Sequence, residues 1–308
     1  MSMIESICLI ENKHAALPDE CVIALGNFDG VHLAHRALLR LAKKMRDESF
    51  PNAACTVFCF REPSSDFLSD ASPAHLSTLA QKLEYFREEG VEYVFLVDFP
   101  TVKNLSPDIF ATELLQGKCR CVAAVCGFNY RFGKDGAGTA KQLSTLLSCP
   151  VLVQNEISVD GETVSSTRIR KLLLEGCVED AAALLTRPYV FSANVVHGKS
   201  LGHKLDAPTI NQFFPSKMLI PRHGVYLTAC EVDGRVLHGV SNVGVHPTVD
   251  ADAKVNCETY LLDFSGDLYG KSVRISFLKF LRPEQKFKDE AALRQQIHAD
   301  IEAARNNF

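Results

Sequence analysis

Two histidines three residues apart, following a short apolar strand and a glycine-containing turn, are the residues of this chain best placed to do chemistry. The segment reads Ile-Ala-Leu-Gly-Asn-Phe-Asp-Gly-Val-His-Leu-Ala-His over residues 23–35. The spacing puts His32 and His35 on one face of the helix that is predicted to follow. Glycines let a backbone approach a phosphate closely, and the start of a helix offers free N–H groups. Two imidazoles there can donate hydrogen bonds to an α-phosphate whose negative charge grows during displacement.

This string resembles the signature of the HxGH nucleotidylyltransferases, and more narrowly the form found in bacterial bifunctional riboflavin kinase/FMN adenylyltransferases. One departure is Ala34, which stands where the family has the glycine of HxGH. The resemblance implies that His32 and His35 are catalytic. It also implies that the turn binds ATP through Gly26, Asn27, Phe28 and Asp29.

A second segment mixes glycines, aromatic rings and cations over residues 127–138. Aromatic rings can stack on a flat ring system, and Arg131 or Lys134 could hold a phosphate. A surface loop is the alternative interpretation. The segment also resembles the flavin-proximal motif of the same adenylyltransferases, which implies that Asn129 and Arg131 contact the flavin substrate.

Residues 165–170 read Ser-Ser-Thr-Arg-Ile-Arg and are predicted to open a helix. Two hydroxyls at such a position are ordinary N-caps. A nearby arginine can also clamp a leaving pyrophosphate with several N–H donors. The string resembles the family's SSTRIR signature, and Arg168 is the residue expected to hold the pyrophosphate.

Residues 198–211 resemble the flavokinase pattern, in which a glycine loop leads into Pro-Thr-x-Asn. Such a loop can wrap phosphates with backbone N–H groups. Thr209 and Asn211 offer the hard oxygen ligands that Mg²⁺ prefers. The resemblance implies that ATP is bound in this loop by Gly198, Gly202 and Lys204.

Glu258 matches the flavokinase base, and a carboxylate there could accept the proton of the ribityl 5′-hydroxyl as it attacks the γ-phosphate. Residues 281–287 complete the match, which implies that Arg282 binds flavin. Three departures from the family pattern lower positive charge or add negative charge near the expected phosphates. They are His203, Asp206 and His246, and from them we expect weaker binding of ATP–Mg²⁺ at the kinase site.

Two kinds of pattern along the chain must position these residues. Strand and helix patterns alternate up to about residue 155, which predicts a parallel sheet covered on both faces. Ligands of such sheets bind beyond the carboxyl ends of the strands. The expected strands are 22–25, 53–60, 93–97, 122–126 and 151–153, and the expected helices are 33–46, 77–89, 106–116 and 139–147.

Two further helices are expected at about 165–175 and 179–185, and from residue 189 the patterns are mostly those of strands. Asp233-Gly234 is a strong hairpin signal between two of them. The expected strands are 189–196, 225–232, 236–243, 257–263 and 272–280, with a closing helix at 289–304. The fold is therefore predicted as α/β plus β. Residues 1–186 form a Rossmann-like nucleotidylyltransferase domain, and residues 187–308 form a small flavokinase β-barrel with a closing helix.

The composition predicts a cytoplasmic enzyme. Of 308 residues, 46% are hydrophobic and 23% charged, and the formal net charge is −4. We expect neither nucleic acid nor membrane as a partner, because the chain is not basic and shows neither a signal peptide nor a membrane-length apolar run. The eleven cysteines are scattered without zinc-type spacing, which favours buried reduced thiols.

Together these features predict a bifunctional enzyme of flavin cofactor synthesis that uses ATP and Mg²⁺. One domain would phosphorylate riboflavin to FMN, and the other would adenylylate FMN to FAD with release of pyrophosphate. Two alternatives stay open at this point. One is a flavin-binding sensor whose catalytic sites have decayed, and the other is a nucleotidyltransferase for another small phosphate.

Overall fold

The structure is a computed structural model that describes residues 17–68, 72–197, 209–232, 234–245 and 255–307. The chain divides into two compact units, Met1–Ser166 and Thr167–Phe308. Helix α8 (Val178–Leu185) packs against strands of the second unit. The domain boundary expected after residue 186 therefore stays a prediction.

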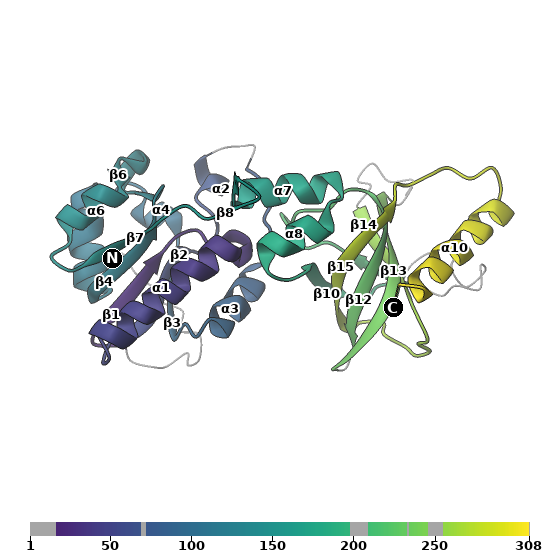
Figure 1. The fold of residues 1–308 in the computed structure, drawn as a ribbon, viewed down its shortest axis with the longest axis horizontal. Helices are drawn as coiled ribbons and strands as arrows, with labels where there is room; N and C mark the ends of the chain where they lie inside the picture. Colours follow the sequence, from purple (N-terminus) through teal and green to yellow (C-terminus); the bar gives the residue numbers. More distant parts are fainter. Residues whose placement is uncertain (1–16, 69–71, 198–208, 233, 246–254, 308) are drawn as a thin grey trace. The chain divides into compact units, whose positions relative to one another are not determined.

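The first unit is built on a five-stranded parallel sheet, as the alternating pattern predicted (Figure 1). The strand order is β3-β2-β1-β4-β7, with β1 in the centre. The strands are β1 (Cys21–Leu25), β2 (Ala54–Phe60), β3 (Tyr93–Val97), β4 (Cys121–Gly127) and β7 (Val151–Gln154). The longer helices are α1 (Leu33–Ser49), α3 (Leu79–Glu88) and α6 (Ala140–Leu146), and the π-helical segment η2 covers Phe110–Lys118.

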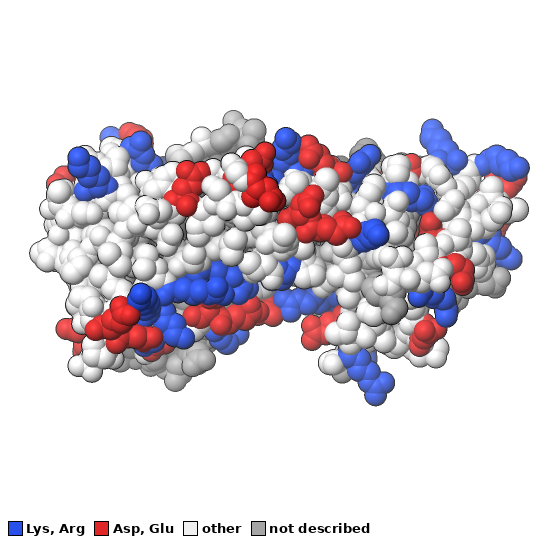
Figure 2. Space-filling view, in the orientation of Figure 1, with Lys and Arg blue, Asp and Glu red and all other residues white. Residues whose placement is uncertain are grey.

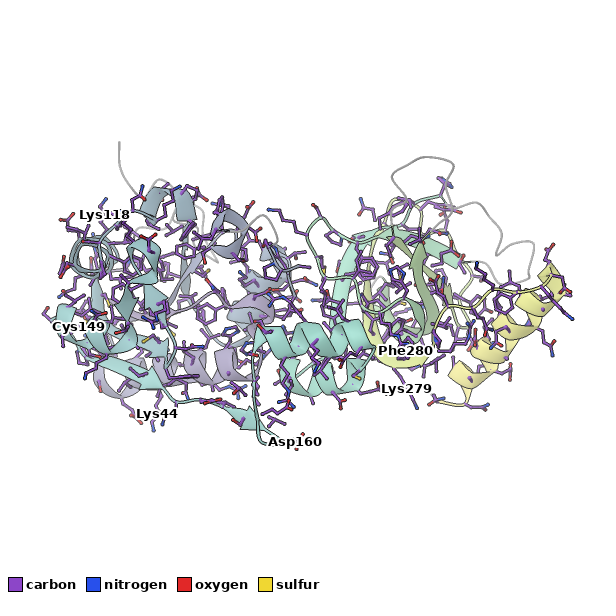
Figure 3. All side chains as sticks on the ribbon, turned by 90° about the horizontal axis from the view of Figure 1, so that it is seen from above. Lys44, Lys118, Cys149, Asp160, Lys279 and Phe280 are labelled. Atoms are coloured by element: carbon purple, nitrogen blue, oxygen red, sulfur yellow. The ribbon has the colours of Figure 1, made fainter. Side chains whose placement is uncertain are left out.

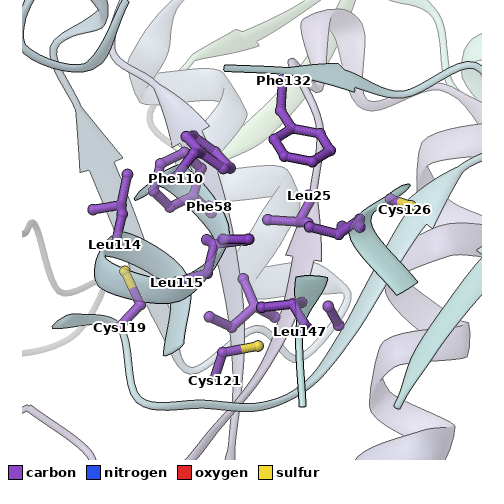
Figure 4. Packing of buried hydrophobic residues seen from close by; sticks show 14 of the residues in the cluster. Leu25, Phe58, Phe110, Leu114, Leu115, Cys119, Cys121, Cys126, Phe132 and Leu147 are labelled. Carbon is purple, nitrogen blue, oxygen red and sulfur yellow. The ribbon is translucent and has the colours of Figure 1, made fainter. Parts of the chain in front are cut away.

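Both faces of this sheet are buried, because successive side chains of a strand point to opposite faces. Cys21, Ile23 and Leu25 of β1 belong to one apolar cluster, which η2 and α6 complete (Figure 4). Val22 and Ala24 belong to the other cluster, which α1 and α3 complete. Full burial on both sides explains why β1 reads as a continuous apolar run.

Side-chain caps and ion pairs fix the helices that cover the sheet. Thr78 opens α3 through a capping box with Gln81, in which each side chain binds the other residue's backbone N–H. Arg36 of α1 pairs with Glu89, whose side chain is only 6% exposed just after α3, and also with Glu88. Figure 2 shows blue and red side chains adjoining where α1 lies beside α3.

Several short elements of the first unit were not predicted. They are η1 (Asp29–Val31), α2 (Ser65–Leu68), α4 (Phe99–Val102), η3 (Lys134–Gly136) and the hairpins β5 (Arg131–Phe132) with β6 (Gly138–Thr139) and β8 (Ser158–Val159) with β9 (Glu162–Thr163). Asp160, at the turn of the second hairpin, has a φ of 55° (Figure 3). The helix expected at 106–116 is divided into α5 (Pro107–Ile109) and η2.

The second unit is an antiparallel six-stranded sheet of order β10-β15-β12-β13-β14-β11. The strands are β10 (Tyr189–Asn194), β11 (Thr209–Phe213), β12 (Gly224–Val232), β13 (Arg235–Val245), β14 (Val255–Leu261) and β15 (Ser272–Arg282). Helix α7 (Ser166–Glu175) precedes α8, and α10 (Glu290–Arg305) closes the unit by packing Ile301 and Ala304 on the sheet. The strands and closing helix were predicted, except β11.

The six-stranded sheet curls until its two end strands meet, which confirms the predicted barrel. The backbone N–H of Val196, just beyond β10, donates to the carbonyl of Asn211 in β11 at 2.8 Å. The buried amide of Gln212 donates to the carbonyls of Ala193 at 2.6 Å and Val273 at 2.8 Å. One side chain of β11 therefore ties β11 to the other end of the sheet.

The apolar cluster between the parallel sheet and η2 gives a prediction about stability. Leu115 of η2 is fully buried there, and its truncation to alanine removes apolar contacts and leaves a cavity. We expect Leu115→Ala to lower the free energy of unfolding of the first unit by about 2–5 kcal/mol in urea denaturation. Leu152→Ala on β7, where the side chain is 39% exposed, is the matched control and should cost much less. Equal losses in the two variants would contradict the burial of Leu115.

Candidate active sites

The turn between β1 and η1 lies where the order of the parallel sheet reverses. The chain passes from β1 to β2 and β3 on one side and then returns to β4 on the other. Leu25, the last residue of β1, pairs with Cys126 near the end of β4. Ligands of open α/β sheets bind at such a crevice. The predicted ATP-binding residues 26–29 and the predicted flavin contact Asn129 therefore leave the sheet from adjacent strand ends.

The backbone of this turn takes conformations that most side chains avoid. Phe28, Gly30 and Val31 have φ angles of 52°, 77° and 39°. A positive φ is uncommon for a phenylalanine and an outlier for a β-branched valine. The Phe28 ring folds beneath Gly26, so that a Cβ on Gly26 would lie 3.2 Å from it. The turn is thus strained, and contacts from outside must hold it.

Hydrogen bonds from distant parts of the chain hold the turn. The Asp29 carboxylate accepts the backbone N–H of Leu76 at 2.9 Å. The Gly30 N–H donates to the Ser77 hydroxyl at 3.1 Å. The Ser166 hydroxyl donates to the Asp29 carbonyl at 3.0 Å. The carboxylate of Asp29, which was predicted to bind ATP, therefore also braces the loop, and Ser166 ties the Ser-Ser-Thr-Arg segment to it.

The two histidines lie together, as their spacing predicted. Helix α1 begins at Leu33, so His32 is its N-cap residue with an extended backbone. The rings of His32 and His35 are stacked with centroids 3.7 Å apart and an interplanar angle of 14°. Phe28 packs against His35 with ring centroids 5.1 Å apart. The phenylalanine of the turn therefore fixes the position of the second imidazole.

The environment of the pair keeps His35 uncharged near neutral pH. Burial lowers the pKa of His35 well below 6.5, and the neighbouring His32 and Lys82 lower it further. A neutral imidazole donates through one ring nitrogen only. Within the described residues the Nδ1 atom of His35 is buried and has no hydrogen-bond partner.

A buried lysine beside the turn was not predicted from the sequence. Lys82 of α3 is 3% exposed, and its ammonium donates to the carbonyl of Asn27 at 3.1 Å. The capping box at Thr78 marks the start of this helix in the sequence. No feature of the sequence indicated that Lys82 faces inward, and the contacts of Leu76 and Ser77 were also missed.

The other predicted residues of the first site lie near the same sheet edge or on α7. Asn129 follows β4 by two residues, and its Oδ1 folds back to 3.5 Å from where a Cβ of Gly127 would stand. Arg131 is exposed on β5. Arg168 is half-buried on α7, two residues beyond Ser166.

In the second unit, the predicted metal ligands and the predicted base come together. Thr209 and Asn211 share one face of β11, and Asn211 lies opposite Glu258 of β14. The side-chain amide of Asn256 links them, donating to Asn211 Oδ1 at 3.2 Å and to Glu258 Oε1 at 3.3 Å. Asn256 is buried and was missed, although its position two residues before Glu258 on a strand places it on the same face.

Arg282, predicted to bind flavin, has a contact that the sequence did not indicate. Its guanidinium forms an ion pair with Asp300 of α10, with Nη2 2.7 Å from Oδ2 and Nε 3.1 Å from Oδ1. Gln296 donates to the same carboxylate at 2.9 Å. These contacts fasten α10 to β15. The flavin contact of Arg282 stays a prediction.

Part of the predicted kinase site lies outside the described residues. This holds for the expected ATP-binding residues and for the three departures from the family pattern, namely Gly198, Gly202, Lys204, His203, Asp206 and His246. Across the ranges that are described, no three His, Cys, Asp or Glu side chains gather as metal ligands, and no helix could span a membrane.

Comparisons with known proteins match both units. A family model for FAD synthetase matches residues 14–168, and one for riboflavin kinase matches residues 185–308. Bifunctional riboflavin kinase/FMN adenylyltransferases of Pseudomonas fluorescens and Escherichia coli are 34% and 35% identical. The alignments cover 96% and 97% of this chain and 96% of each relative. A crystal structure described as a macrolide-efflux protein from Streptococcus pneumoniae is 30% identical with a TM-score of 0.86, covering 96% of both chains.

The low pKa of His35 predicts a pH dependence of stability. When the chain unfolds, the ring regains a pKa of about 6.5 and binds a proton that the folded state excludes. Below about pH 6.5 the free energy of unfolding should therefore fall by up to about 1.4 kcal/mol per pH unit. The variant His35→Gln should lose this part of the dependence when urea denaturation is compared at pH 7.5 and 5.5.

The exposed His298 of α10 supplies the control for this prediction. The variant His298→Gln should keep the pH dependence of the parent. If His35→Gln also keeps it, His35 is not held neutral in the folded protein.

Proposed function

The chain belongs to the family of bifunctional riboflavin kinase/FMN adenylyltransferases, and from this premise we propose how its two units divide the work. The barrel unit transfers the γ-phosphate of ATP to riboflavin and gives FMN. The α/β unit joins FMN to the adenylyl group of a second ATP and gives FAD and pyrophosphate. The stacked pair of His32 and His35 at the switch point of the parallel sheet is the observation that carries the second assignment.

In the adenylyl transfer, a phosphate oxygen of FMN attacks the α-phosphorus of ATP. A new P–O bond forms as the bond to the pyrophosphate oxygen breaks, so that no covalent enzyme intermediate is needed. His32 and His35 donate hydrogen bonds to the α-phosphate as its charge grows. Arg168 holds the leaving pyrophosphate. Asn129 and Arg131 hold FMN near the carboxyl end of β4.

In the kinase reaction, Glu258 accepts the proton of the ribityl 5′-hydroxyl as its oxygen attacks the γ-phosphate. Asn256 supports this role, because its amide holds the Glu258 carboxylate and the Asn211 side chain in one arrangement. Arg282, fixed by Asp300, contributes to binding the flavin.

The donors on β11 fit a magnesium ion. Thr209 offers a hydroxyl oxygen and Asn211 an amide oxygen, both hard ligands of the kind that Mg²⁺ selects. Asn211 Oδ1 accepts one hydrogen bond from Asn256 and keeps a second lone pair. When bound, the ion neutralises charge on the transferring phosphate. The protein itself contributes by orienting the side chains of Thr209 and Asn211 beside Glu258.

Product analysis tests the assignment of both activities. The purified chain is incubated with riboflavin, ATP and Mg²⁺, and the flavins are separated by chromatography. We expect FMN to form first and FAD to follow. Formation of FMN without FAD would contradict the adenylylation activity, whereas tight flavin binding without any product would favour a sensor. Conversion of a different phosphate compound in place of FMN would favour another nucleotidyltransferase.

The histidine pair gives a prediction that separates the two units. His32→Ala removes one preorganised donor from the adenylyl-transfer site, which costs about 10²–10³-fold in rate. We expect FAD formation from FMN and ATP to fall by this factor, and riboflavin phosphorylation by the same preparation to stay near the parental rate. His298→Ala on the exposed face of α10 is the control. FAD formation at the parental rate by His32→Ala would contradict the role of this ring.

Glu258 gives the converse prediction. Glu258→Gln keeps the shape of the side chain and removes the proton acceptor, which costs about 10²–10⁴-fold in riboflavin phosphorylation. Conversion of added FMN to FAD should persist. Glu231→Gln, at an exposed glutamate of β12, is the matched control and should leave both activities unchanged. A Glu258→Gln variant that phosphorylates riboflavin at the parental rate would show that Glu258 is not the base.

A further inference from the structure

Lys82 is a buried cation that the proposed mechanism has not used. It lies on α3, in the first turn after the capping box of Thr78 and Gln81. Its exposed fraction is 3%, and its ammonium donates to the carbonyl oxygen of Asn27 at 3.1 Å. That carbonyl belongs to the turn that follows β1.

The charge of Lys82 has no anionic partner in the part of the chain that the structure describes. The hydrogen-bond acceptor of its ammonium there is a neutral carbonyl, and no carboxylate lies within ion-pairing distance of it. Burying an ammonium costs free energy unless a charge or several acceptors compensate for it. A buried, uncompensated cation beside a strained turn at a ligand crevice is an arrangement that an anionic ligand would complete.

The contact with Asn27 also determines where a backbone donor points. The peptide bond between Asn27 and Phe28 is planar and trans, so its C=O and N–H groups point in opposite directions. Because Lys82 holds the carbonyl, the N–H of Phe28 is directed away from α3. No described residue accepts a hydrogen bond from that N–H.

The segment that carries Lys82 is itself fixed to the turn. Leu76 and Ser77, just before the capping box, bind the side chain of Asp29 and the N–H of Gly30. Residues 76–82 therefore contact three residues of the turn, Asn27, Asp29 and Gly30. This makes Lys82 a side chain of defined position rather than a mobile surface cation.

We propose that Lys82 is a positioning residue for adenylyl transfer, which fixes the Asn27–Phe28 peptide so that its N–H faces the nucleotide phosphates and which places a positive charge behind the turn. The proposal rests on the proposed function of the α/β unit. It adds a residue of α3 to those that recognise the triphosphate of ATP and the pyrophosphate product. The lowered pKa of His35, to which burial, His32 and Lys82 contribute, is consistent with a cation at this place.

The test compares activity with stability in the variant Lys82→Met. Methionine keeps the length and most of the volume of the lysine stem and removes the donor and the charge. We expect kcat/KM for ATP in FAD formation from FMN to fall by about 10²-fold, the loss typical of a misplaced binding group. The KM for FMN and the rate of riboflavin phosphorylation should stay within about twofold of the parent. Because an uncompensated buried charge is removed, the thermal midpoint should stay equal or rise.

The reverse reaction isolates the phosphate contact. Conversion of FAD and pyrophosphate to FMN and ATP uses only the adenylyl-transfer site, so ATP binding by the kinase site does not interfere. We expect the KM for pyrophosphate to rise in Lys82→Met. Lys82→Arg, which keeps a charge and donors, should recover activity to within about tenfold of the parent. Lys44→Met, at an exposed lysine of α1 (Figure 3), is the matched control.

The outcomes separate this proposal from the proposed function. If the parent makes no FAD, the function assigned to the α/β unit is wrong. If the parent makes FAD and Lys82→Met has an unchanged kcat/KM for ATP and an unchanged KM for pyrophosphate, the role of Lys82 is wrong. A lower thermal midpoint without recovery in Lys82→Arg would make Lys82 a packing residue and also overturn the proposal. Should Lys82→Met fail to fold, Lys82→Gln replaces it under the same criteria.

Discussion

The left-handed backbone of the turn after β1 is the constraint on which the rest of the α/β unit's site depends. Phe28 and Val31 adopt positive φ angles that their side chains disfavour. The contacts that hold this backbone in place come from Ser77, Lys82 and Ser166, which are separated from the turn residues they bind by 47, 55 and 137 positions in the sequence. The turn is therefore stable only within the assembled unit. The contacts made on folding offset the strain of this backbone before any ligand binds. A preorganised site of this kind does not have to rearrange during the reaction.

The same constraint explains how the His pair is built. Phe28, turned inward by its left-handed backbone, packs its ring between the sheet, Phe86 and His35. The His35 ring therefore packs against the Phe28 ring and also stacks on the His32 ring. A cation from α3 approaches the same turn. Burial, His32 and Lys82 together lower the pKa of His35, so its ring is held neutral in a site where a ligand can bring negative charge.

The regular elements could be predicted because each carries its own periodicity. The five parallel strands are short apolar runs, and β1 divides its residues between two cores as alternation requires. Strand β11 was missed because it is short and three of its five residues are polar, Thr209, Asn211 and Gln212. The two small hairpins were missed because strands of two residues have no detectable period, although Asp160-Gly161 is a hairpin turn sequence.

The candidate sites could be predicted only where the chemistry is local in sequence. His32 and His35 share a helix start, so their spacing alone brings the pair together. Thr209 and Asn211 share a face of β11, but that strand was missed, and the pair was named from the resemblance to the flavokinase pattern. The family resemblance gave Asn211 and Glu258 their separate roles, but it predicted neither their pairing across β11 and β14 nor the link through Asn256. Lys82 could not be predicted, because a lysine in an amphipathic helix usually faces solvent and its burial depends on a contact 55 residues away.

The strand order of the barrel also has a consequence for synthesis on the ribosome. Strand β10 begins the sheet of the second unit and forms its ladder with β15, which is the last strand to be made. Roughly eighty residues of chain must be translated between them, which takes about 4–16 s at elongation rates of about 5–20 residues per second. During that interval β10 is an apolar strand that lacks the ladder with β15, the kind of segment that favours aggregation. All five strands of the parallel sheet are translated earlier. The nascent chain can therefore fold its nucleotide-binding unit before β15, the last strand of the barrel, is made.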